Sequence, residues 1–294
     1  MADEYEKMMK EMQKKMMEQM GIVMPEDIED AYMEQAMAQQ AAAAQMTGMS
    51  PDALTALMNE AMGEAMSGMN FDFGDGEDED DADLAAFIEA NPVPAEYDRL
   101  LPIGALLIGT WGEPYETLAI TSEPEEVAYA LENGWGIESR EDGIKMLESL
   151  MKGRHANSFK ERHEAMKAGR FDEVDGEDAD DYNLSVEGIT EALSLPKSLV
   201  DNCETLLAWD LERVGYLARL FYKIGYISED EAWDWIKKAA VESKNTFNSW
   251  EEYIVSLLIG RGFAMGVAPE PYMVALDLLT DRRDFLDARP ISNL

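Results

Sequence analysis

The sequence predicts an all-α protein: a compact multi-helix domain preceded by a Met-rich helical arm and an acidic flexible tether. Ser followed within a turn by Glu or Asp, a pattern that starts helices, recurs along the last two thirds of the 294 residues. Apolar residues in this region recur at helical spacing. No pair of segments alternates apolar and polar residues as the strands of a sheet do, and only residues 116–120 (ETLAI) resemble a strand.

Composition divides the chain into an arm and a domain. Sixteen of the 21 methionines fall in the first 69 residues, whereas all six tryptophans lie from Trp111 onward. We therefore expect a Met-rich amphipathic helical arm over residues 1–69, an acidic tether over residues 70–97 and an all-helical domain over residues 98–294.

The arm is predicted to form three short helices, over residues 3–20, over residues 25–48 and from Ser50 onward. Methionine is flexible and polarizable, so a Met-rich face suits an apolar or basic protein partner. Alternatively, the arm packs on the domain or self-associates as a small helical bundle. The methionines assigned to a partner-binding face are Met8, Met9, Met12, Met16 and Met20.

Two acidic segments are predicted to be solvated. Eight of the twelve residues from Asp72 are acidic, which predicts a tether, followed by a short helix over residues 83–89. The second segment, residues 171–182, is expected to be a surface loop within the domain. Neither segment matches the calcium-loop pattern, so we expect no dedicated metal site.

Local signals place the boundaries of several helices in the domain. Serine before a helix accepts a hydrogen bond from a first-turn amide, and Glu231 three residues after Ser228 completes a capping box. Glycine commonly ends a helix. The expected starts follow Ser122, Ser139, Ser228 and Ser249, and the expected ends are Asn133-Gly134, Gly153 and Gly169.

The longest periodic segment, residues 198–226, carries a wide apolar stripe and is expected to be one central helix. Cys203 would lie on it as a buried structural thiol, because no base that would activate it is visible nearby.

Charge and composition exclude several functional classes. The chain has 61 acidic and 24 basic residues, for a formal net charge of −37. This balance argues against binding to nucleic-acid phosphates or anionic lipids. One cysteine and two histidines leave no Cys-based zinc site and little for a His-rich one. We expect no cofactor, no membrane span and, because the first residues lack a signal-peptide pattern, a cytoplasmic location.

Trp209, Asp210 and Arg213 form the sharpest polar cluster. Asp210 and Arg213 are three residues apart on one expected helix, so they can pair, and two further arginines could join them. Two interpretations stay open: an internal ion-pair network that fixes helix packing, or a pocket that binds an anion or carboxylate. The candidate residues are Trp209, Asp210, Arg213, Arg219, Trp250 and Arg261.

No catalytic residue is named from the sequence. A histidine base needs an orienting partner, and none is evident for His155 or His163, which we expect at the surface. Five tryptophans could stack a planar ligand, but core packing is the more common role. These are Trp135, Trp209, Trp233, Trp235 and Trp250.

Three segments carry a family resemblance: residues 135–159 (WGIESREDGIKMLESLMKGRHANSF), 208–233 (AWDLERVGYLARLFYKIGYISEDEAW) and 248–263 (NSWEEYIVSLLIGRGF). In order and spacing they resemble the bacterial domain-of-unknown-function family 1266, which includes the YbeR and YbeU type proteins. The resemblance covers roughly residues 100–263, and Arg154 splits the Gly-His pair of the pattern. It implies no activity, so it supports the domain boundaries rather than a function.

Two functions follow as hypotheses. The first is a non-enzymatic protein-binding module for a basic or apolar partner, such as a regulator, an immunity-type inhibitor or a specialised chaperone. The alternative is an enzyme or small-anion sensor with a pocket around Trp209, Asp210, Arg213, Trp250 and Arg261.

Overall fold

The computed structural model describes residues 77–294, so the predicted arm and the five methionines assigned to its partner-binding face lie outside the described residues. Over the range that is described the chain is helical and contains no β-strand, which confirms the all-α prediction. Residues 116–120, the one expected strand, are irregular. None of the helices within residues 77–294 combines the length and apolar character that crossing a bilayer requires.

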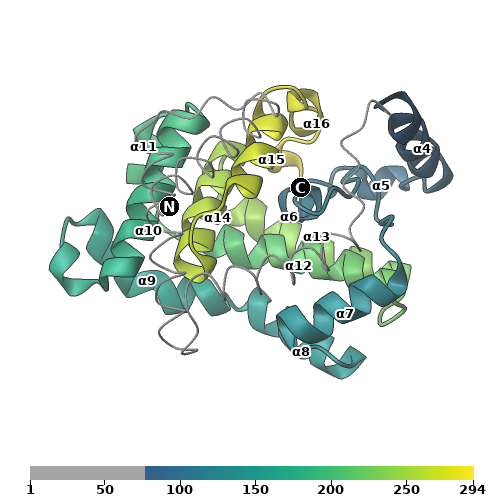
Figure 1. The fold of residues 1–294 in the computed structure, drawn as a ribbon, viewed down its shortest axis with the longest axis horizontal. Helices are drawn as coiled ribbons and strands as arrows, with labels where there is room; N and C mark the ends of the chain where they lie inside the picture. Colours follow the sequence, from purple (N-terminus) through teal and green to yellow (C-terminus); the bar gives the residue numbers. More distant parts are fainter. Residues whose placement is uncertain (1–76) are drawn as a thin grey trace, which may run out of the picture. The chain divides into compact units, whose positions relative to one another are not determined.

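The chain runs through short and medium helices joined by turns and by irregular connections (Figure 1). In order these are α4 (Glu77–Ala90), α5 (Ala95–Asp98), α6 (Ala105–Gly109), α7 (Pro124–Trp135), α8 (Arg140–Met151), α9 (Arg154–Lys167), a 3-10 turn (Phe171–Glu173), α10 (Gly176–Glu187), a π turn (Gly188–Ala192), α11 (Lys197–Asp201), α12 (Leu207–Lys223), α13 (Glu229–Thr246), α14 (Trp250–Met265), α15 (Pro269–Leu279), α16 (Arg283–Asp287) and a final 3-10 turn (Ile291–Asn293).

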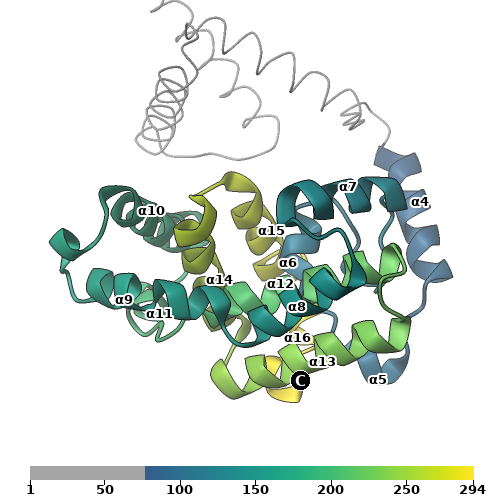
Figure 2. The same cartoon turned by 90° about the horizontal axis from the view of Figure 1, so that it is seen from below.

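Helix α12 lies at the centre of this unit. It packs against α13, α14, α8, α6, α9 and α7, as the two views show (Figures 1 and 2). Thirteen of its 17 residues are buried, and α14 is apolar on nearly all sides. A helix that is buried on all sides needs hydrogen-bond partners for every polar side chain that it carries. On α12 these buried polar side chains are Asp210, Glu212 and Arg219.

The prediction of one helix over residues 198–226 is wrong in its first part, because a non-helical connection separates α11 from α12. In the break, Thr205 accepts a hydrogen bond from the Leu207 amide at 3.2 Å, and Lys167 donates to the Cys203 carbonyl at 2.6 Å. These bonds satisfy the backbone outside a helix. Cys203 therefore lies in the connection rather than on α12, although its thiol is buried as expected and burial raises its pKa to about 11.

Most of the predicted boundaries are confirmed. Ser139, Ser228 and Ser249 each accept a first-turn amide hydrogen bond, and Ser228 forms the capping box with Glu231. Gly153 and Gly169 both adopt the left-handed backbone that ends α8 and α9.

Two boundaries are wrong. Glu123, not Ser122, caps α7, because Ser122 is held by the carboxylate of Glu113. The same helix continues through Gly134 and ends at Trp135, with the left-handed Gly136 after it.

The acidic segments are more helical than expected. Helix α4 begins at Glu77, six residues before the predicted start. The expected loop over residues 171–182 is instead a 3-10 turn followed by the first half of α10, which Asp175 caps through the amide of Glu177. Tyr182 and Ser185 pack inward one turn apart, and this spacing buries one face of α10 against α14 while most acidic residues face outward.

Candidate functional site

Asp210 and Glu212, two buried carboxylates on α12, cap the first turns of two other helices. Asp210 accepts hydrogen bonds from the amides of His155 at 3.0 Å and Ala156 at 2.8 Å, in the first turn of α9. Its side chain is fully buried. The N-cap of α9 is Gly153, which has no side chain, so Asp210 supplies the missing cap from another helix.

Glu212 plays the same part for α6. It accepts from the amides of Gly104 at 3.0 Å and Leu107 at 3.1 Å, and from the Tyr253 hydroxyl at 2.9 Å. Burial raises the pKa of Glu212, and these three donors and the charge of Arg219 oppose that rise. Gly104, the N-cap of α6, again lacks a side chain and has a φ of 88°.

Arg219 belongs to this second network. Its fully buried guanidinium donates to the carbonyl oxygens of Leu101 at 2.9 Å, Ile103 at 2.6 Å and Gly215 at 3.1 Å. Burial lowers its pKa to about 10, which leaves it charged at neutral pH. Arg219 therefore ties the chain before α6 to α12, and no hydrogen bond or ion pair joins it to Asp210 or Arg213 within the described part of the chain.

Asp210 and Arg213 are linked through His155. The Nδ1 atom of His155 lies 2.7 Å from Asp210 Oδ1, and Arg213 Nη1 lies 3.0 Å from Nε2 and 3.2 Å from Nδ1. With the Nδ1 proton donated to Asp210, Nε2 accepts from the guanidinium. The expected surface position of His155 is wrong, since only 19% of its side chain is exposed.

Two indole rings contact the guanidinium of Arg213. Its central carbon lies 4.2 Å from the ring centroid of Trp135 and 4.9 Å from that of Trp209. Burial lowers the pKa of Arg213 to about 10, so it stays charged at neutral pH. We call Trp135, His155, Trp209, Asp210 and Arg213 the Arg213 site.

The remaining two candidates lie elsewhere. Trp250 donates from Nε1 to the Arg289 carbonyl at 2.9 Å and packs edge-on against Tyr253. Arg261, at the end of α14, donates to the Gly266 carbonyl. The six predicted residues therefore do not form one cluster, and three of them, Trp209, Asp210 and Arg213, belong to the Arg213 site. Their role in binding a ligand stays a prediction.

His163 is a buried histidine that the sequence reasoning placed at the surface. It is 2% exposed and lies against the rings of Tyr182 and Phe263. Its Nε2 has no hydrogen-bond partner among the described residues, and burial lowers its pKa to about 4. It borders a cavity of about 200 Å³ whose mouth includes Lys160 and Thr205.

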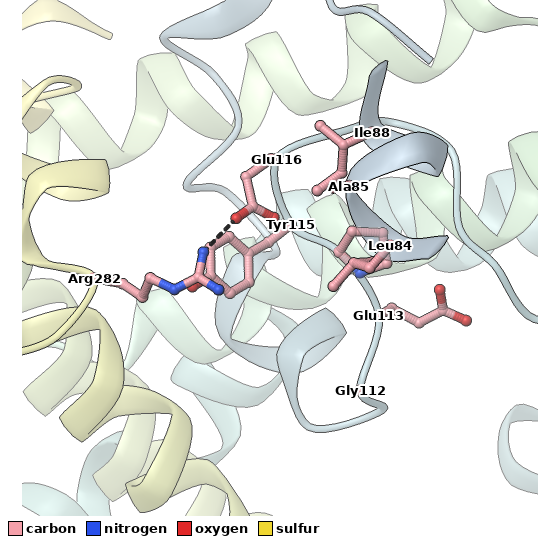
Figure 3. Close-up of a pocket in the computed structure, with 9 residues that line it drawn as sticks. Leu84, Ala85, Ile88, Gly112, Glu113, Tyr115, Glu116 and Arg282 are labelled. Carbon is pink, nitrogen blue, oxygen red and sulfur yellow. Dashed lines mark hydrogen bonds and ion pairs between the residues drawn. The ribbon is translucent and has the colours of Figure 1, made fainter. Parts of the chain in front are cut away.

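A larger groove of about 360 Å³ lies beside α4 (Figure 3). Its polar side holds the ion pair between Glu116 and Arg282 at 2.9 Å, and the Tyr115 hydroxyl donates to Asp277 at 3.2 Å. The apolar wall comes from α4. The lining residues are Leu84, Ala85, Ile88, Gly112, Glu113, Pro114, Tyr115, Glu116 and Arg282.

The outer surface of α7 carries an exposed aromatic residue among acidic ones. Tyr129 is 70% exposed. Glu125 and Glu126 lie one turn before it and Glu132 one turn after it, all exposed, and none of the three forms an ion pair in the part of the chain that the structure describes. We call these four residues the α7 face. Helical spacing alone would have revealed it, but the sequence reasoning did not single it out.

One family comparison matches this chain. The family model described as "Protein of unknown function (DUF1266)" matches residues 130–284, a range that contains the whole Arg213 site. No curated protein and no solved structure matches the chain. The match confirms the resemblance drawn from the three sequence segments, whereas the narrower likeness to YbeR and YbeU type proteins stays a prediction.

Proposed function

We propose that this chain, which belongs to the DUF1266 family of proteins of unknown function, is a non-enzymatic protein-binding module whose α7 face contacts a basic partner. The observation that carries the proposal is the exposure of Tyr129 among three exposed glutamates that form no ion pair within residues 77–294. An exposed tyrosine can supply a large, amphipathic contact, and such residues are enriched among those that dominate binding energy.

The electrostatics of α7 favour a basic partner over an uncharged one. The helix has no Lys or Arg, so nothing on it neutralises Glu125, Glu126 and Glu132. Residues 91–294 contain 39 acidic and 20 basic residues, so the rest of the domain adds to the same negative field. Complementary charge of this kind accelerates encounter and fixes orientation. An apolar group on the partner would then contact Tyr129.

The test begins with the full chain, tagged and captured from its native host at low and at high salt. We expect a basic protein to be retained at near-equal amounts and to be lost as the salt concentration rises. Capture that is unchanged across the salt range would contradict an electrostatic contact.

Variants then locate the contact. We expect Tyr129→Ala to weaken binding by about tenfold, and Glu125→Gln combined with Glu132→Gln to slow association several-fold. The matched control is Glu148→Gln combined with Glu161→Gln, which removes the same charge from exposed positions on α8 and α9. If the control double variant weakens binding as much as the α7 double variant, the partner responds to the net charge of the protein, and the α7 face is not the interface.

A further inference from the structure

We infer that the Arg213 site binds a small carboxylate ligand, whose two oxygens accept hydrogen bonds from Nε and Nη2 of Arg213. Only Nη1 of this guanidinium is used, by His155. Nε and Nη2 form no hydrogen bond within residues 77–294, and neither is among the fully buried unpaired atoms there, so each keeps some exposure to solvent. Two parallel N–H groups on one edge of a guanidinium match the oxygen spacing of a carboxylate.

The guanidinium is held in place before any ligand arrives. The rings of Trp135 and Trp209 both lie against it, and the hydrogen bonds that run from Asp210 through His155 hold Nη1. A free arginine side chain loses rotamer freedom when it binds, and this one has already lost it on folding. Such preorganisation distinguishes Arg213 from the exposed arginines of the surface.

A second cationic side chain, that of Arg154, lies near Arg213 although the protein is acidic. No acidic residue lies between Glu148 and Glu161, a segment that contains Lys152 and Arg154. Arg154 is near enough to contribute to the lowered pKa of Arg213, and it forms no ion pair among the residues described. Asp210 is the one carboxylate among the five residues of the site, and its oxygens are occupied by the first turn of α9 and by His155.

The aromatic surface beside Nε and Nη2 of Arg213 favours an organic anion over an inorganic one. Trp135 is partly exposed, and its ring lies 5.9 Å from Tyr216, which in turn meets Trp111 at 5.6 Å. Trp111 is 42% exposed. The carbon skeleton of a carboxylate held at Arg213 could therefore lie against indole rings.

The experiment is a titration of the full chain with sodium citrate, against sodium chloride of matched ionic strength, followed by tryptophan fluorescence and by calorimetry. We expect a saturable signal with citrate alone, because Trp135 and Trp209 flank the binding atoms. Arg213→Lys removes the two parallel N–H donors and the planar guanidinium that stacks on the indole rings, and it should weaken citrate binding at least about tenfold. The control is Arg282→Lys, at an arginine whose guanidinium is paired with Glu116, and it should bind citrate like the wild type.

A second variant covers the case in which Arg213→Lys does not fold. Arg154→Ala changes an exposed side chain and should weaken citrate binding several-fold while the melting temperature stays unchanged. The inference is overturned by an absence of saturable citrate binding in the wild type, or by equal binding in the wild type and both site variants. Saturable binding of inorganic phosphate with none of citrate would overturn the assignment to a carboxylate.

Discussion

Replacing His163 by Phe should make the stability of the domain less sensitive to acid. Burial, with a smaller contribution from the charge of Lys167, lowers the pKa of His163 from 6.5 to about 4. The unfolded chain therefore binds a proton between these values that the folded chain does not. The titration of His163 leaves the free energy of unfolding unchanged above pH 6.5 and lowers it as the pH falls through 6.5 toward 4.

The size of this effect follows from the two pKa values. The difference between the unfolded and folded pKa values corresponds to roughly 3 kcal/mol in the free energy of unfolding, and about 2 kcal/mol of this is lost by about pH 5. Phenylalanine fits the surroundings of His163, which already include the rings of Tyr182 and Phe263, and it does not titrate. The variant should therefore lack this component of the acid response, whatever its stability at neutral pH.

The assay is urea unfolding of the full chain, followed by circular dichroism, at several pH values from about 8 to about 5. The quantity of interest is the difference in free energy of unfolding between wild type and His163→Phe at each pH. We expect this difference to shift by about 2 kcal/mol in favour of the variant across the range. Lys160→Gln, at the exposed mouth of the same cavity, should keep the wild-type pH dependence. If the free energies of unfolding of wild type and His163→Phe change in parallel with pH, the pKa of His163 is not lowered in the folded protein.

Three further predictions concern the scaffold, each checked by urea or thermal unfolding. Asp210→Asn should destabilise the domain by about 3 kcal/mol, because an amide cannot accept from all the donors that converge on the carboxylate; a loss below about 1 kcal/mol would contradict the capping role. Gly215→Ala should lower the melting temperature by several degrees, since its Cβ would overlap the Ile103 carbonyl, whereas Gly176→Ala meets nothing within 4 Å and should be near neutral. Ser228→Ala should cost about 1 kcal/mol through loss of the α13 cap, and an unchanged midpoint would show that Glu231 alone suffices.

Sequence reasoning succeeded where the information is local. The serine that caps α13 and the glutamate that answers it are three residues apart, so their pairing depends on helix geometry alone. It failed where local signals competed: the apolar period continued through residues 202–206, yet the Thr205 hydroxyl and the distant Lys167 hold that segment out of the helix.

The α7 face could also have been found from the sequence. Tyr129 and its glutamates follow the i, i+3 and i+4 spacing of one helix surface.

The Arg213 site shows what the sequence could not decide. Asp210 and Arg213 were rightly placed one turn apart on a buried helix, but the groups that complete them come from elsewhere: His155 is 55 residues away from Asp210, and Trp135 comes from the end of α7. The burial of His163 likewise depends on α10 and α14 closing over it. The helical class, most helix ends and the acidic character are evident in the sequence alone, because these follow from spacing and composition. Which charged side chains are structural and which donors lack a partner depends on the packing of distant helices, because that packing creates burial and brings hydrogen-bond partners together.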